Sequence, residues 1–143
     1  MKRLRPRLLA AIAAIVVLAA AACGKGNSSS GTTSPSVTIK TETFTGTVPV
    51  RGSDFHTFSV AQTGEVDATL TAAGPPSTIT MGLAFGTVNG AACALIPGAS
   101  TNTQAGTAIQ LAGTVSPGTL CIQVSDIGSQ TALVTYTVTV AHP

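Results

Sequence analysis

The side chains best suited to covalent chemistry lie in one short polar run, Ser53-Asp54-Phe55-His56. A hydroxyl, a carboxylate and an imidazole can act as nucleophile, orienting acid and base, provided that they converge in space. Neighbouring residues of a strand point to opposite faces, so Ser53 and His56 diverge if the run is extended. We therefore interpret the run as a polar turn that enters a strand, with a hydrolase using His56 as the weaker hypothesis.

The second histidine and the acidic residues offer no stronger site. His142 lies one residue from the end of the chain, where we expect it to be exposed or to cap a strand end. Calcium takes about six to eight oxygen ligands, usually from several carboxylates of one loop. The carboxylates that could supply them are instead scattered along the chain: Asp54, Glu65, Asp67 and Asp126. The sequence therefore predicts no metal site and no cofactor.

Cys23 follows a segment that is organised as an export signal. The segment begins with four basic residues: Lys2, Arg3, Arg5 and Arg7. An apolar stretch of fifteen residues, 8–22, comes next and is shorter than the roughly 20 residues of a bilayer-spanning helix. A basic, then an apolar, then a small-residue region is typical of a secretory signal that is removed after export.

The residues that lead to this cysteine, Leu18-Ala19-Ala20-Ala21-Ala22-Cys23, resemble the lipobox of bacterial lipoproteins. The resemblance implies that the Cys23 thiol receives a diacylglyceryl group and that signal peptidase II cleaves between Ala22 and Cys23. Two or three acyl chains would make the attachment effectively permanent, since each buried methylene contributes about 0.8 kcal/mol. We therefore expect residues 1–22 to be a cleaved signal helix, and residues 23–36 to be a lipidated cysteine with a disordered Gly/Ser/Thr tether.

Cys93 and Cys121 are the two cysteines left for the exported domain. An even pair in an oxidising compartment most simply forms a disulfide. The sequence has no CxxC motif and places no further ligand near either residue, which argues against a redox pair or a metal site. Cys121 has the parity of Gln123, opposite to Ile122, so we expect the bridge on an outer face or between strand edges.

Few charges remain once the signal is removed. Three basic residues, Lys25, Lys40 and Arg51, stand against five acids, which gives a net charge of −2. No basic patch is left to neutralise phosphates, which argues against nucleic-acid binding. The chain has no tryptophan, and Tyr136 shares the parity of core valines, so we expect it to be buried. Carbohydrate binding through an exposed aromatic platform therefore lacks support.

From residue 37 onward, polar and apolar residues alternate with period two. In the last run, Val134, Tyr136, Val138 and Val140 alternate with three threonines. Similar alternation occupies these earlier segments: 41–48, 57–60, 66–72, 79–85, 109–115 and 120–124. Strict alternation is typical of a strand with one buried and one wet face, and Thr and Val favour that pleated surface.

Turn signals separate the alternating runs. Asn89-Gly90 predicts a hairpin with a type I′ turn, and Pro97-Gly98 and Ser116-Pro117-Gly118 mark further turns. No helical period appears after the signal. About eight strands at short spacing predict an all-β domain over residues 37–143, an antiparallel β-sandwich with its two inner faces packed together.

Two strand pairs carry a likeness to a known family. One pair consists of the first two successive strands of the domain, 44–48 (FTGTV) and 54–60 (DFHTFSV). The other consists of its last two successive strands, 115–126 (VSPGTLCIQVSD) and 135–140 (TYTVTV). Over roughly residues 40–141, this pattern resembles bacterial pre-peptidase C-terminal (PPC-like) domains. The resemblance implies a jelly-roll-like sandwich of secreted and surface proteins, often appended to proteases and without catalytic residues of its own.

Together these observations predict a cell-envelope lipoprotein that displays a non-catalytic β-sandwich as a binding or interaction module, and not an enzyme. The expected partners are the membrane, through the lipid anchor, and an envelope protein or polysaccharide. By resemblance to enterobacterial sorting, Gly24 in place of an aspartate after the lipidated residue favours the outer membrane or cell surface, and the inner membrane stays open as an alternative. Two alternatives stay open: a structural envelope protein without a discrete ligand, and an accessory domain associated with a hydrolase.

Overall fold

The computed structural model describes residues 36–143, so the predicted signal, the Ala22–Cys23 cleavage site and most of the tether lie outside the described residues. The described part is all-β. Its eight strands are β1 (Lys40–Val48), β2 (Ser53–Val60), β3 (Gly64–Gly74), β4 (Thr80–Asn89), β5 (Ala92–Gln104), β6 (Leu111–Val115), β7 (Gly118–Asp126) and β8 (Val134–His142). Within residues 36–143 there is no helix able to cross a membrane.

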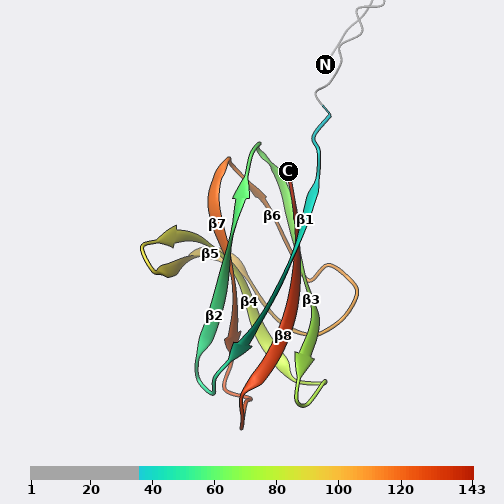
Figure 1. Cartoon of the computed structure of the whole chain (residues 1–143), viewed down its shortest axis with the longest axis vertical. Helices are drawn as coiled ribbons and strands as arrows, with labels where there is room; N and C mark the ends of the chain where they lie inside the picture. The colour runs from blue at the N-terminus through green and yellow to red at the C-terminus, as the bar shows by residue number, and fades with distance from the viewer. Residues whose placement is uncertain (1–35) are drawn as a thin grey trace, which may run out of the picture. The chain divides into compact units, whose positions relative to one another are not determined.

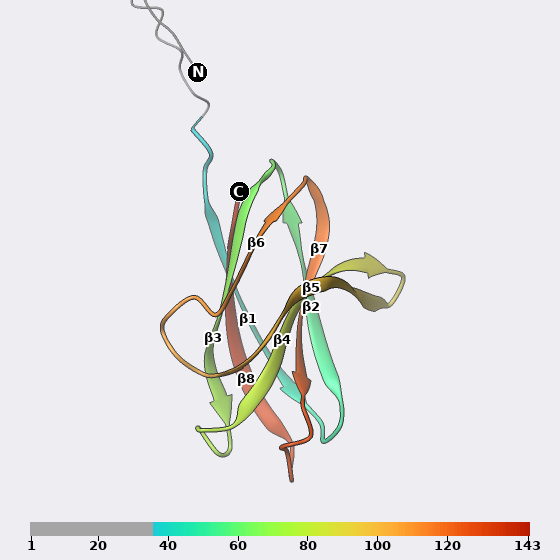
Figure 2. The ribbon, with the colours of Figure 1, turned by 180° about the vertical axis from the view of Figure 1, so that it is seen from behind.

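The strands form two four-stranded antiparallel sheets that pack face to face (Figures 1 and 2). One sheet has the order β1-β8-β3-β6 and the other the order β2-β7-β4-β5. This order is that of an eight-stranded jelly roll, in which the chain passes repeatedly from one sheet to the other. The predicted antiparallel β-sandwich is therefore confirmed, including its strand number.

The inner faces of both sheets form the core, as the alternation predicts. In β8, the four residues from Val134 to Val140 that share one parity are buried, and the threonines between them face outward. The largest fully buried apolar side chains are Phe85, Leu70, Met81, Leu83 and Ile122. Each such side chain contributes about 1.5–3 kcal/mol through the removal of apolar surface from water.

Two local sequence interpretations were wrong. Ile109 was expected in a strand, but it is 59% exposed and β6 begins only at Leu111. Pro97-Gly98 was expected to form a turn, yet it lies inside β5 at a register break, where Gly86 pairs with Leu95 but Ala84 pairs with Ser100. The extra residues of β5 are accommodated as a bulge, which bends the strand without ending it.

The β4–β5 hairpin also differs from its predicted turn type. Asn89 pairs with Ala92, so the two central residues are Gly90 and Ala91. Only Gly90 has a positive φ, of 60°, whereas a type I′ turn needs positive φ at both central positions. The hairpin itself is confirmed, and its tip projects from the side of the sandwich (Figure 1).

The predicted disulfide between Cys93 and Cys121 is present and ties this hairpin to β7. β4 lies between β5 and β7 in the sheet, and the bridge passes over its outer face at Gly86. A Cβ atom at Gly86 would lie 2.6 Å from the Cys93 sulfur and 3.0 Å from the Cys121 sulfur. The expected outer-face position is thus confirmed, and it requires a residue without a side chain beneath the bridge.

Candidate functional site

Both histidines lie where the edge strand β1 of one sheet meets the edge strand β2 of the other. We call this line of contact the edge seam. Its inward-facing side chains are Glu42, Phe44, Asp54, His56, Tyr136 and His142. Side chains from β1, β2 and β8 thus hold the two sheets together along one side of the sandwich.

His56 is packed between aromatic rings and is not paired with a nucleophile. Its ring stacks on Phe44, with centroids 4.9 Å apart and planes 10° apart, and Tyr136 approaches it edge-on. Its Nε2 atom lies 3.9 Å from Asp54 Oδ2 and has no hydrogen-bond partner among the described residues. Ser53 is exposed, and strand alternation directs it away from the face that Asp54 and His56 share. The structure thus brings together two of the three groups of the polar run, but not the hydroxyl.

The Asp54 carboxylate instead binds Tyr136, whose hydroxyl donates to Asp54 Oδ2 over 2.8 Å. Tyr136 is 3% exposed, so its predicted burial is confirmed. Burial, and then the neighbouring carboxylate, raise the pKa of Tyr136 far above its usual value. Gly46 of β1 lies against this pair, and a Cβ atom there would collide with both the carboxylate and the phenol.

His142 was expected to be exposed or to cap a strand, and the expectation of exposure was wrong. It is 1% exposed, because β8 continues to this residue and its ring packs on Phe58. Its Nε2 atom lies 3.0 Å from Glu42 Oε1, and Lys40 Nζ lies 2.8 Å from the same oxygen. Lys40, and then His142, hold the pKa of Glu42 below its usual value.

Asp126 organises the end of the sandwich opposite to Lys40 and His142. Its Oδ1 atom accepts backbone N–H groups from Gly128, Ser129 and Gln130, and its Oδ2 atom accepts that of Arg51 over 2.7 Å. These bonds join the β7–β8 loop to the β1–β2 turn. Within residues 36–143, no three His, Cys, Asp or Glu side chains gather as metal ligands.

Replacement of Asp126 by alanine is expected to lower the unfolding free energy at neutral pH but not in acid. The N–H groups, that of Arg51 first, lower the pKa of Asp126, so its stabilising effect is complete above its unfolded-state pKa. The effect is lost as the pH falls through the lowered pKa that Asp126 has in the folded protein. Urea unfolding from neutral pH to about pH 2 should show the two proteins converging, and a difference that persists in acid would contradict this role.

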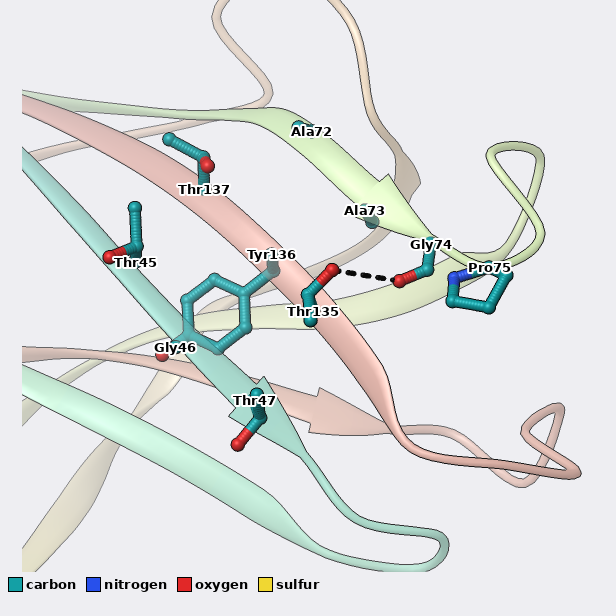
Figure 3. A pocket seen from close by; sticks show the side chains of 10 residues that line it. All are labelled: Thr45, Gly46, Thr47, Ala72, Ala73, Gly74, Pro75, Thr135, Tyr136 and Thr137. Atoms are coloured by element: carbon teal, nitrogen blue, oxygen red, sulfur yellow. Dashed lines mark hydrogen bonds between the residues drawn. The ribbon is translucent and has the colours of Figure 1, made fainter.

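An open groove of about 690 Å³ lies on the outer face of β1, β8 and β3 (Figure 3). Its lining residues are Thr45, Gly46, Thr47, Ala72, Ala73, Gly74, Pro75, Thr135, Tyr136 and Thr137. We call it the threonine groove. On one side the groove is bordered by β3, which continues to pair with β8 after a bulge and offers only small residues there: Ala72 pairs with Thr137, and Gly74 with Thr135.

The threonines of this groove belong to an ordered array. Thr45 pairs with Thr137, and Thr47 with Thr135, across the β1–β8 ladder. The Thr135 hydroxyl donates to the Gly74 carbonyl over 3.0 Å, a bond that is drawn as a dashed line in Figure 3. The groove therefore offers hydroxyl and methyl groups in fixed rows, with no acidic or basic side chain among its lining residues.

A scan of the chain against protein-family models and a search of curated proteins both found no match. The resemblances in the lipobox and in the strand pairs therefore stay predictions from the sequence. The sequence predicts that Tyr136 is buried and that the disulfide lies on an outer face or between strand edges, but it does not predict the threonine groove. The one signal for it was the run of threonines at alternate positions in β1 and β8, which is equally typical of any solvated strand face.

Proposed function

We propose that this chain is a lipid-anchored, non-catalytic module of the cell envelope that holds a ligand in the threonine groove. The observation that carries the proposal is the groove itself, which is open to solvent and built from ordered hydroxyl-bearing strands. Both histidines of the domain are packed in the edge seam, and the nearest carboxylate to His56 already accepts the Tyr136 hydroxyl. This packing favours binding over hydrolysis.

The lipid anchor rests on the order of residues up to Cys23, and the display role rests on the resemblance of the strand pairs to PPC-like domains. A jelly-roll topology agrees with what that resemblance implies. In this role the lipid anchor determines where the domain is located, and the threonine groove determines which ligand it binds. The alternative, a structural envelope protein without a discrete ligand, assigns no function to the groove.

The test compares the full chain with three variants in a bacterium that processes lipoproteins. The expected mature protein begins with a diacylglycerylated Cys23 by mass spectrometry, and Cys23→Ser loses that modification. Purified lipoproteins in vesicles are then mixed with solubilised envelope carbohydrate and envelope protein, as separate fractions. Ala72→Gln, which fills the groove, should abolish binding. Ala112→Gln, at an exposed alanine of β6 on the same sheet but outside the groove, should not.

An unmodified cysteine would overturn the anchor. Equal binding by the Ala72→Gln and Ala112→Gln proteins, or no binding of either fraction by the wild type, would overturn the groove as the ligand site.

A further inference from the structure

We infer that the ligand of the threonine groove is a neutral glycan chain, an inference that rests on the proposed function and names its ligand class. The first ground is charge. The described residues hold two basic side chains, Lys40 and Arg51, against five acids, and neither base lines the groove. An anionic polymer would meet net repulsion, and a cationic one would find no carboxylate in the groove.

The second ground is the hydrogen-bonding chemistry of the lining. A threonine hydroxyl supplies one donor and two acceptor lone pairs, the same set that a sugar hydroxyl supplies. The Thr135 hydroxyl already donates to Gly74, so it is left as an oriented acceptor. Its row partner Thr47, and the neighbouring row of Thr45 and Thr137, place further hydroxyls beside it.

The third ground distinguishes a glycan from an extended peptide. A peptide that binds by strand addition needs a sheet edge with unpaired N–H and C=O groups. The groove is centred on β8, whose backbone groups are already used in the ladders with β1 and β3. A peptide added to the free edge of β1 would extend the sheet beside the threonine rows without covering them. Over β8, an occupant therefore meets the hydroxyl and methyl groups of the threonines, beside the backbone of Gly46 and Gly74 and the Pro75 ring.

The spacing of the rows fits a ring-shaped unit. Adjacent strands lie about 4.7–4.9 Å apart, and residues two apart along a strand are separated by roughly 6.6–6.8 Å. Four hydroxyl-bearing residues at these spacings, Thr45, Thr47, Thr135 and Thr137, enclose an area on the scale of one sugar ring. Tyr136 points inward and supplies no stacking platform, so affinity comes from hydrogen bonds and contacts with methyl groups and Pro75.

The test uses vesicles that carry the full lipoprotein and three fluorescent probes: a neutral dextran or mannan, the anionic polysaccharide alginate, and an uncharged Ser/Thr/Pro-rich peptide. The neutral polysaccharide is expected to bind best. Thr45→Val with Thr137→Val keeps the shape of one row but removes two hydroxyls, and it should weaken binding about tenfold. The matched control, Thr43→Val with Thr139→Val, alters the next row of the same two strands outside the groove and should change binding less than about twofold.

Preference for alginate or for the peptide would overturn the inference, as would equal weakening by the two double variants. The proposed function would survive one further result: no neutral polysaccharide binds, yet Ala72→Gln still abolishes binding of an envelope fraction. In that case only the ligand class is wrong. If the wild type binds no envelope fraction at all, both the inference and the proposed function fail.

Discussion

Replacing Cys93 and Cys121 together by alanine is expected to lower the free energy of unfolding by about 3–4 kcal/mol. The two residues are separated by 28 positions, and in the chain-entropy model a loop of this length restricts the unfolded chain by that amount. The bridge is also the one covalent link between the projecting β4–β5 hairpin and β7 in the described part of the chain. Urea unfolding followed by circular dichroism measures the loss.

The same unfolding experiment distinguishes the stability that comes from the disulfide bond from the stability that comes from the two cysteine side chains. Reduction of the wild type should bring its stability down to that of the double variant, whereas the double variant should not respond to the reductant. Hydrogen exchange should rise first at the hairpin tip around Thr87 and Ala94, and least at the base of β5 around Thr103, which keeps its pairing with β4. Unchanged stability on reduction would show that β5 is held by its ladder alone.

Replacing Gly46 by alanine is expected to cost about 2–4 kcal/mol, a large effect for one methyl group. The added Cβ atom would occupy the space of the Asp54 carboxylate and the Tyr136 hydroxyl. The hydrogen bond between them must then break or β1 must move away from β2, and either change leaves a partly buried carboxylate and a buried phenol without their partner. Thermal and urea unfolding measure the loss.

Gly113→Ala is the matched control, because Gly113 also lies in an edge strand but has nothing within 4 Å of the position that an added Cβ atom would take. Its stability should stay level or rise slightly, since alanine loses less conformational freedom on folding than glycine. A spectroscopic readout adds to the comparison: in Gly46→Ala, the pKa of Tyr136 should fall because the Asp54 carboxylate is lost as a partner, but it should stay above that of an ordinary tyrosine as long as the ring stays buried. Equal stability of the two variants, with an unshifted tyrosine titration, would mean that the seam does not depend on Gly46.

The fold was predictable because alternation, turn residues and the absence of a helical period all indicate the same architecture. Val134 to Val140 illustrates this, since every second residue is buried as the pattern requires. The failures are local. Ile109 is apolar and in phase with Leu111, but the crossing from β5 to β6 leaves it exposed. Pro97 and Gly98 are common turn residues, yet a bulge can hold them inside a strand.

The edge seam could not be predicted, because its partners are distant in sequence. Glu42 and His142 are 100 positions apart, and Asp54 and Tyr136 are 82 apart. Only the pairing of β1 with β8, and its contact with β2, brings them together. The requirement for glycine at position 46 could not be predicted for the same reason. In the sequence Gly46 is one small residue among threonines, and the requirement arises from two side chains on other strands.

The first residue of β1 and the last residue of β8 lie at the same end of the jelly roll, since Lys40 pairs with His142. The row of Thr47 and Thr135 lies near the other end of the same two strands, seven residues further along β1, or roughly 23 Å away. A fluorescent label or purification tag joined after Pro143 would therefore emerge beside the first residues of β1 and well clear of this row. A surface coated through such a tag would present the row outward, in the orientation best suited to measuring capture from solution.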